Sequence, residues 1–221
     1  MSQGRFILPP PNLAPPADSP DSANALPAPV PRTFVSRAGL KLEAALLAFA
    51  IDPGGQVCAD LGANVGGFTD CLLQFGAAKV YAVDTAYGVI AWTLRKHPRV
   101  VVKDRTNALH VSLPEAVSLV SVDVGWTRQE KILPAVARLF SAGTAATVLT
   151  LIKPHYESDL ARTQRGVLTP AQSEDVLWQT IDRIAALQTD GHGAWRVKGV
   201  VRSPVEGQKG NVEYVAWLER G

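Results

Sequence analysis

Short apolar runs alternate with longer amphipathic segments from about residue 36 to the C-terminus. The apolar runs are bounded by glycine, proline or charged residues, as strands usually are. They predict seven strands, at residues 56–61, 78–84, 99–104, 116–124, 146–154, 194–204 and 210–219. The amphipathic segments predict helices at residues 36–46, 66–76, 87–97, 128–140 and 171–188.

The order of these elements favours an α/β fold. Alternating strands and helices are typical of a mostly parallel sheet with helices on both faces. The last two strands are joined by the short segment "VEGQKG", so they form an antiparallel pair. We therefore expect a mostly parallel seven-stranded sheet with an antiparallel C-terminal edge strand.

Residues 1–32 have a different composition, with nine of the sixteen prolines of the chain. Such a segment builds neither helices nor sheet ladders and buries little apolar surface. We expect a Pro-rich disordered tail over residues 1–32 and one domain over residues 33–221. Docking of the tail to a proline-binding partner is the alternative.

The net charge, the cysteines and the lengths of the apolar runs limit the possible partners and the cellular location. A net charge of +2 permits a nucleic-acid partner without indicating one. Cys58 and Cys71 lie in apolar surroundings, and no Cys/His cluster has metal-ligand spacing, so we expect reduced core thiols in a cytoplasmic protein. There is no apolar run of about 18 residues, so we expect no transmembrane helix and no membrane partner.

The segment "DLGANVGGFTD" joins the first strand to the next helix. Gly62, Gly66 and Gly67 would let the backbone approach a ligand at the end of the strand, although they could also make only a tight turn. Asp60 ends the first strand and Asp84 the second, where an acid can bind ribose hydroxyls. Because the G-x-G-x-x-G fingerprint is absent, the pattern suits S-adenosylmethionine better than NAD.

Four charged residues stand in apolar contexts where a lone charge is costly. Lys41 lies among alanines on a predicted helix, and Glu213 lies inside the last strand. Asp123 and Lys153 end two central strands. Each residue alone could be solvated at the end or edge of its element. If the two lysines and the two acids paired in one cluster, none of the four charges would be buried without a partner.

These motifs resemble the FtsJ-like ribose 2′-O-methyltransferase family, and within it the TlyA-type ribosomal RNA methyltransferases. The similarity rests on "SRAGLKLEAAL", "DLGANVGGFTDCLLQFGAAKVYAVD", "YGVIAW", "RTN", "LIKPHYE" and "GNVEYVAWL", which occur in the same order. The resemblance implies a Rossmann-like S-adenosylmethionine-dependent methyltransferase fold and an RNA substrate, ribosomal RNA or a ribosomal subunit.

The resemblance also implies site residues. The Lys-Asp-Lys-Glu tetrad of the family falls on Lys41, Asp123, Lys153 and Glu213. From the strand-end motifs we predict cofactor binding at Asp60, Gly62, Ala63, Gly66, Gly67, Phe68 and Asp84, and adenine contacts at Asp104 and Asn107, which could also be polar loop residues in turns. We interpret Lys153 as the general base, oriented by Asp123 and Glu213, with Lys41 adjusting the local charge and helping to hold the hydroxyl.

The chain departs from the TlyA pattern in two places. TlyA-type proteins usually begin with a small RNA-binding domain, where this chain has the Pro-rich segment. The loop after Asp123 reads "VGWTRQ" instead of serine and an aromatic-apolar run, so substrate choice can differ. A methyltransferase acting on a small molecule or a protein, and a non-catalytic RNA-binding module, are the alternative functions.

Overall fold

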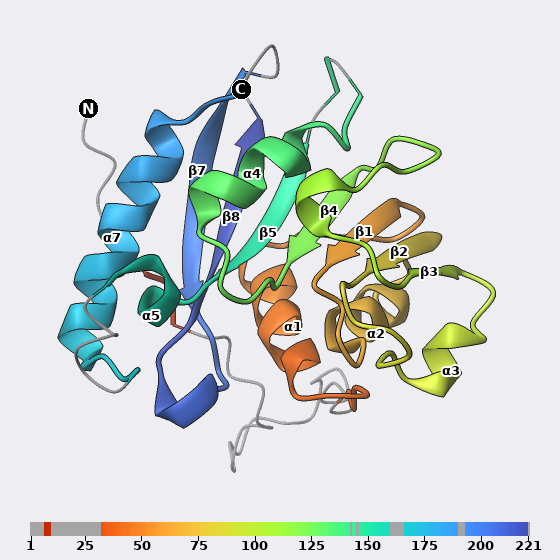
Figure 1. Ribbon diagram of the computed structural model, residues 1–221, viewed down its shortest axis with the longest axis horizontal. Helices are drawn as coiled ribbons and strands as arrows, with labels where there is room; N and C mark the ends of the chain where they lie inside the picture. Colours follow the sequence, from red (N-terminus) through yellow and green to blue (C-terminus); the bar gives the residue numbers. More distant parts are fainter. Residues whose placement is uncertain are drawn as a thin grey trace, which may run out of the picture.

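A computed structural model describes residues 7–9, 32–141, 143–144, 146–159, 166–189 and 193–220. Its centre is one twisted sheet with strand order β3-β2-β1-β4-β5-β8-β7-β6 (Figure 1). The strands are β1 Val57–Leu61, β2 Lys79–Val83, β3 Val100–Lys103, β4 Leu119–Val122, β5 Thr147–Ile152, β6 Gln188–Thr189, β7 Gly193–Arg202 and β8 Tyr214–Arg220. Strands β1 to β5 pair in parallel, and β8 runs antiparallel to both β5 and β7.

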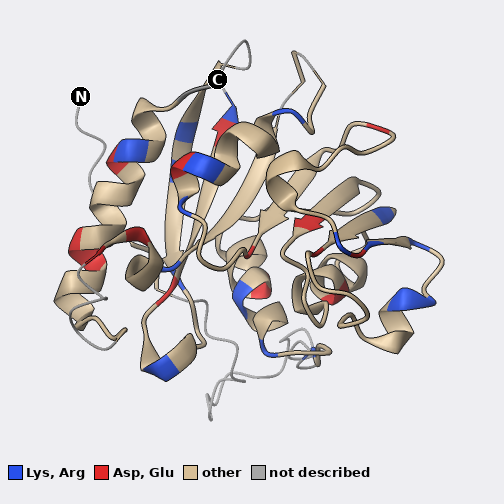
Figure 2. Cartoon of the chain, in the orientation of Figure 1, with Lys and Arg blue, Asp and Glu red and all other residues tan. Residues whose placement is uncertain are grey.

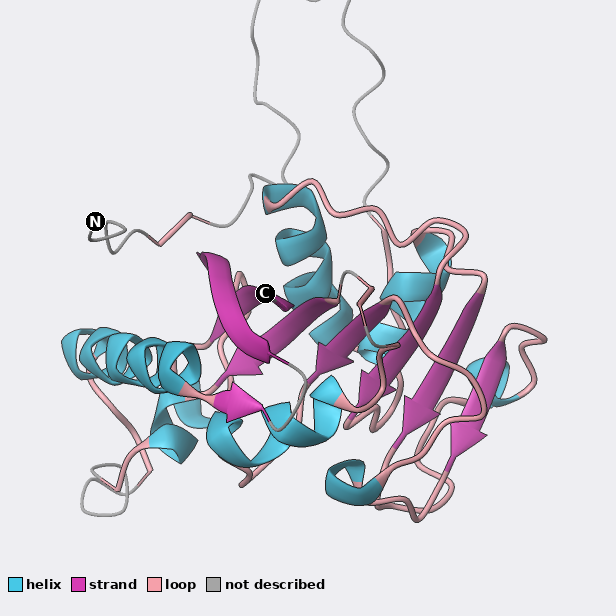
Figure 3. Ribbon diagram, turned by 90° about the horizontal axis from the view of Figure 1, so that it is seen from above, coloured by secondary structure: helices cyan, strands magenta, loops and turns pink. Residues whose placement is uncertain are grey.

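Helices cover both faces of this sheet, as Figure 3 shows. Helices α1, α2 and α3 pack on one face through Leu42, Leu72 and Leu94, while α4 and α7 pack on the other through Ile132 and Leu177. The helical elements are α1 Ala38–Ala48, α2 Gly67–Gln74, α3 Trp92–Arg95, η1 Ala108–His110, α4 Gln129–Ala137, α5 Pro154–Glu157, α7 Pro170–Ala186 and η2 Gln208–Gly210. The layered architecture confirms the predicted α/β class.

The two C-terminal strands form the predicted antiparallel side of the sheet. All seven predicted strands form, with β8 between β5 and β7, and a further two-residue strand, β6, pairs with β7 at the edge. Burial explains the inner position of β8. Most side chains of β8 are buried, whereas those of β7 alternate between exposed and covered positions. A strand buried on both faces belongs inside a sheet.

The helix predicted at residues 87–97 shortens to the four residues of α3. Gly88 has a positive φ of 73°, and Ala91 is extended, with its N–H donating to the Val65 carbonyl at 2.9 Å. These constraints keep the chain out of helical geometry until Trp92. The segment instead wraps over the loop that precedes α2.

Most of the predicted tail lies outside the described residues, so its disorder stays a prediction. Residues 7–9 are described, and Leu8 pairs in parallel with Val201 of β7. The Leu8 N–H donates to the Val200 carbonyl at 2.9 Å, and the Arg202 N–H donates to the Leu8 carbonyl at 3.1 Å. This part of the segment therefore contacts the domain.

No helix of the described residues is both long and apolar enough to cross a membrane.

Candidate active site

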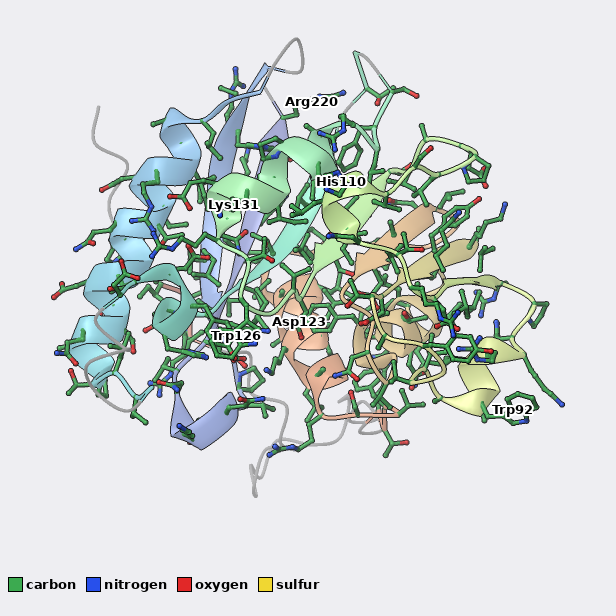
Figure 4. The ribbon with its side chains drawn as sticks, in the orientation of Figure 1. Trp92, His110, Asp123, Trp126, Lys131 and Arg220 are labelled. Atoms are coloured by element: carbon green, nitrogen blue, oxygen red, sulfur yellow. The ribbon has the colours of Figure 1, made fainter. Side chains whose placement is uncertain are left out.

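A pocket of about 760 Å³ lies at the carboxyl ends of the central strands. Parallel strands end at the same edge of a sheet, so the segments after β1, β2, β4 and β5 meet there. The start of α1 and the turn between β7 and β8 close the remaining sides. Figure 4 shows Asp123 and Trp126 together at this end of the sheet, with Arg220 at the opposite end.

The four charged residues predicted as a tetrad all line this pocket and form two ion pairs. The Lys41 Nζ pairs with the Glu213 carboxylate. The Lys153 Nζ lies 2.5 Å from Asp123 Oδ1, in an ion pair outside hydrogen-bond geometry, and donates to the Val124 carbonyl at 3.5 Å. At most 18% of any of these four side chains is exposed, so the pairing satisfies charges that would be costly alone.

The pairing differs from our interpretation of the sequence. We expected Glu213 to orient Lys153, but the Glu213 carboxylate pairs with Lys41 instead. The cause is the sheet order. Strand β8 follows directly on Glu213 and contacts α1, which carries Lys41 (Figure 2). Gly207 makes room for this arrangement, because a Cβ there would overlap the Glu213 carboxylate.

The other half of the pocket is built from backbone and small residues. Gly62 has a φ of 87°, and a Cβ at this position would overlap the Asp123 carbonyl, so only glycine fits between β1 and β4. Asp84 Oδ2 accepts the Asn64 N–H at 2.7 Å, and Asp84 Oδ1 accepts the Ala86 N–H at 2.8 Å. Each carboxylate oxygen has a further lone pair for a ligand hydroxyl.

The predicted cofactor-binding residues fall into two groups. Those that line the pocket are Gly62, Ala63, Phe68, Asp84 and Asn107. Four others do not: Asp60, Gly66, Gly67 and Asp104.

The residues outside the pocket support its shape instead of touching it. The carboxylate of Asp104 pairs with Arg95 at 2.7 Å. A Cβ at Gly66 would overlap Leu94, and one at Gly67 would overlap Ser36 ahead of α1. These two glycines therefore allow close packing around the loop.

Asp60 is fully buried behind the pocket wall. Its carboxylate accepts hydrogen bonds from Thr69 Oγ1 at 2.7 Å and Ser121 Oγ at 3.1 Å. Burial raises the pKa of Asp60 to about 7, and the charge of Asp123 adds to this, while the two hydroxyl hydrogen bonds act against it. Asp60 therefore acts as an internal link between β1, α2 and β4 in this geometry.

An aromatic group stands beside Lys153, and the sequence left its role open. The ring of Trp126 is tilted against that of Tyr156 at 4.5 Å, and Tyr156 contacts His155 at 4.2 Å. Burial, with the nearby charges of Lys153 and Lys41, lowers the pKa of His155 to about 4. The imidazole is therefore neutral near pH 7 and stands among aromatic rings.

The turn at residues 205–208 also lines the pocket, and no prediction assigned it a role. Its only sequence signal is the glycine in "VEGQKG", which reads as an ordinary turn residue. The contact of Gly207 with Glu213 depends on tertiary structure that periodicity does not reveal.

The pocket suits a nucleoside cofactor. Its volume lies within the range of small-molecule sites, and its wall combines a close backbone approach at Gly62 with a carboxylate at Asp84. The charged half, with Lys153 and Asp123, lies across the same cavity. A bound cofactor would therefore face both ion pairs.

Comparison with known proteins agrees with this geometry. The model of the FtsJ-like methyltransferase family matches residues 34–220. A Mycobacterium tuberculosis relative, the 16S/23S rRNA (cytidine-2′-O)-methyltransferase TlyA, is 40% identical over 191 residues, which cover 85% of this chain and 69% of the relative.

Solved structures share the fold. A candidate hemolysin from Streptococcus thermophilus superposes with a TM-score of 0.76 at 34% identity, covering 85% of this chain and 67% of that one. A candidate S-adenosylmethionine-dependent methyltransferase from Listeria monocytogenes superposes with a TM-score of 0.56 at 15% identity, covering 84% of this chain and 100% of that one. The chain belongs to the FtsJ-like methyltransferase family, and its cofactor is S-adenosylmethionine.

Proposed function

We propose that this protein methylates a ribose 2′-hydroxyl of RNA, with ribosomal RNA as the substrate class. The observation that carries the proposal is that the two buried ion pairs, Lys41–Glu213 and Lys153–Asp123, line one pocket. A ribose hydroxyl is a weak acid and needs a positioned base. The relative from M. tuberculosis is named for this reaction on 16S and 23S rRNA, which supports the choice of substrate.

We assign the proton transfer to Lys153. When bound, S-adenosylmethionine supplies an electrophilic methyl carbon, which the ribose oxygen takes as the carbon–sulfur bond breaks and its electron pair stays on sulfur. The Lys153 ammonium, which is paired with Asp123 in the structure, first releases a proton to solvent, and the resulting amine then accepts the proton of the hydroxyl. Asp123 and the Val124 carbonyl hold the Lys153 Nζ in place.

The second pair has a supporting role in this proposal. Glu213 fixes the Lys41 ammonium in the wall of the same pocket, where it can donate a hydrogen bond to the ribose. Asp84 binds the ribose hydroxyls of the cofactor, and Gly62 lets the backbone lie against it. Holding both substrates in one geometry supplies a further part of the rate.

Trp126 gives the RNA substrate an exposed aromatic surface beside the pocket. Its side chain is 84% exposed beside the pocket, and the Tyr156 ring packs against it. An RNA ribose that enters the pocket requires bases splayed out beside it, and aromatic rings can stack on such bases.

The test is methyl transfer with radiolabelled S-adenosylmethionine and ribosomal RNA, followed by mapping of 2′-O-methyl sites. We expect the radiolabel on ribose 2′-oxygens of the RNA, and no label when the target nucleotide is a 2′-deoxynucleotide. Labelling of a protein or a small molecule, with RNA unlabelled, would refute the proposal. The cytoplasmic location, and a ribosomal subunit or a tail-binding protein as partner, stay predictions.

A further inference from the structure

A second cavity, of about 310 Å³, opens next to the active-site pocket. We call it the α4–α5 groove, because its walls come from the start of α4, from α5 and from the loops beside them. The lining residues are Trp126, Arg128, Lys131, His155, Tyr156, Ser158 and Asp159. Three of these, Trp126, His155 and Tyr156, also line the active-site pocket, so the two cavities share an aromatic wall.

The groove carries two cations. Arg128 precedes α4 and Lys131 lies in its first turn, and Figure 4 shows Lys131 on α4, with Trp126 nearer the active site. Arg128 pairs with Asp159 at 3.1 Å, with side chains 41% and 71% exposed. Such an exposed pair contributes little stability, so a phosphate can compete for the guanidinium. The neighbouring Glu130 is paired with Arg183 at 2.6 Å.

The backbone N–H at the start of α4 is already hydrogen-bonded, so an anion in the groove would bind the side chains of Arg128 and Lys131. The Gln129 N–H at the start of α4 already donates to Glu157 Oε1 at 3.1 Å. The side chain of Gln129 also donates to the Leu151 carbonyl at 3.3 Å. A phosphate in the groove would therefore meet Arg128 and Lys131.

The shared wall has an unusual conformation. Trp126 has a φ of 59°, a left-handed geometry that is rare for a large side chain and strains the backbone. With this backbone geometry, Trp126 lines both cavities, although it is the most exposed large apolar side chain of the described residues. Burial in the protein does not explain the position of this exposed ring, whereas stacking against an aromatic ligand would.

We propose that the α4–α5 groove binds the nucleotide adjacent to the methylated one, with its phosphate held by Arg128 and Lys131 and its base against the Trp126–Tyr156 wall. This inference rests on the proposed function. Aromatic rings together with cations fit single-stranded RNA, in which every nucleotide offers a π face and a phosphate. An acidic peptide would use the cations but would leave the aromatic wall without a partner.

The test compares two double variants of the full chain. Arg128→Ala/Lys131→Ala removes the cations of the groove. Lys79→Ala/Lys198→Ala is the matched control, because it removes two surface cations that are each in an ion pair and that line neither the active-site pocket nor the groove. Steady-state methyl transfer to ribosomal RNA is measured at several salt concentrations, with cofactor affinity measured by calorimetry.

We expect the groove variant to raise the KM for RNA by about 10-fold at 0.1 M salt, with kcat and cofactor affinity within twofold of wild type. The slope of log KM against log salt should fall by about 0.7 for each lost phosphate contact. The control should change KM by less than about twofold and leave the slope unchanged.

The outcomes separate the two proposals. If wild type methylates RNA but both double variants behave alike, the groove does not bind RNA and the proposed function stands. If wild type transfers no methyl group to RNA, both proposals fail.

Discussion

The ammonium group of Lys41 forms an ion pair with the carboxylate of Glu213, which follows it by 172 residues in the chain. Only 11% and 4% of these side chains are exposed. Two charges taken out of water in this way each depend on the other. The pair therefore links α1 to the beginning of β8 while it forms one wall of the pocket.

Breaking this pair from one side should destabilise the fold. We expect Glu213→Gln to lower the free energy of unfolding by about 3 kcal/mol, because Lys41 keeps a buried charge without a counter-ion. The double variant Lys41→Met/Glu213→Gln should regain most of that loss, since neither charge remains. Urea denaturation of the four proteins in this cycle measures the coupling, and additive effects would show that the two residues do not depend on each other.

Lys153→Ala should reduce methyl transfer by about 10² to 10⁴-fold if its amine takes the proton of the hydroxyl. Lys153→Arg makes the test sharper, because a guanidinium keeps the positive charge but does not act as a base. We expect both variants to be inactive and to bind cofactor within about twofold of wild type by calorimetry. An active Lys153→Arg protein would assign Lys153 an electrostatic role only.

Trp126→Ala should raise the KM for RNA by roughly 5- to 100-fold, the loss of one base–aromatic stacking contact. Trp126→Phe should keep most of the affinity, since the ring face remains. Val101→Ala, which removes another partly exposed apolar side chain outside the pocket, is the control. Equal KM values for wild type and Trp126→Ala in RNA titrations would show that the exposed ring does not touch the substrate.

Much of this architecture follows from patterns along the chain. Continuous apolar runs located every long strand, because a strand buried on both faces leaves such a run, and amphipathic segments located the main helices. Lys41 and Glu213 stood out because a charge in an apolar segment needs a partner. Which partner it finds depends on the position of β8 inside the sheet, which local sequence does not encode.

The same limit explains Asp60 and Trp126. A residue near a strand end can face the ligand or the packing layer, and Asp60 faces Thr69 and Ser121. The exposure of Trp126 results from its positive φ, a conformation for which an aromatic residue carries no sequence signal. In both cases, the backbone conformation at a single residue decides which way its side chain points.

Asp84→Asn should weaken cofactor binding by about 10-fold, because a neutral amide accepts hydrogen bonds less strongly than a carboxylate. One amide oxygen also replaces two carboxylate oxygens that receive the Asn64 and Ala86 N–H groups. Calorimetric titration with S-adenosylmethionine measures the loss. Asp104→Asn, at a carboxylate outside the pocket, should bind cofactor like wild type, and a similar loss in both variants would contradict the role of Asp84.

Asp60 should make stability depend on pH. Its pKa rises from 3.8 to about 7 on folding, so between these values the folded protein binds more protons than the unfolded chain. Stability should therefore be highest below about pH 4 as far as this group is concerned, and should fall as pH rises to 7, by up to about 1.4 kcal/mol per pH unit. Asp60→Asn removes the titration, so its stability relative to wild type should rise over the same interval.

Urea denaturation of wild type and Asp60→Asn from pH 4 to 8 measures this difference. Contributions from other groups, including Glu157 with its pKa near 7, are common to both proteins and cancel in the comparison. Asp175→Asn, at an exposed carboxylate of α7, is the control for loss of one charge. If the wild-type and Asp60→Asn curves run parallel across this interval, Asp60 does not change its protonation on folding, and its buried carboxylate is held ionised by Thr69 and Ser121.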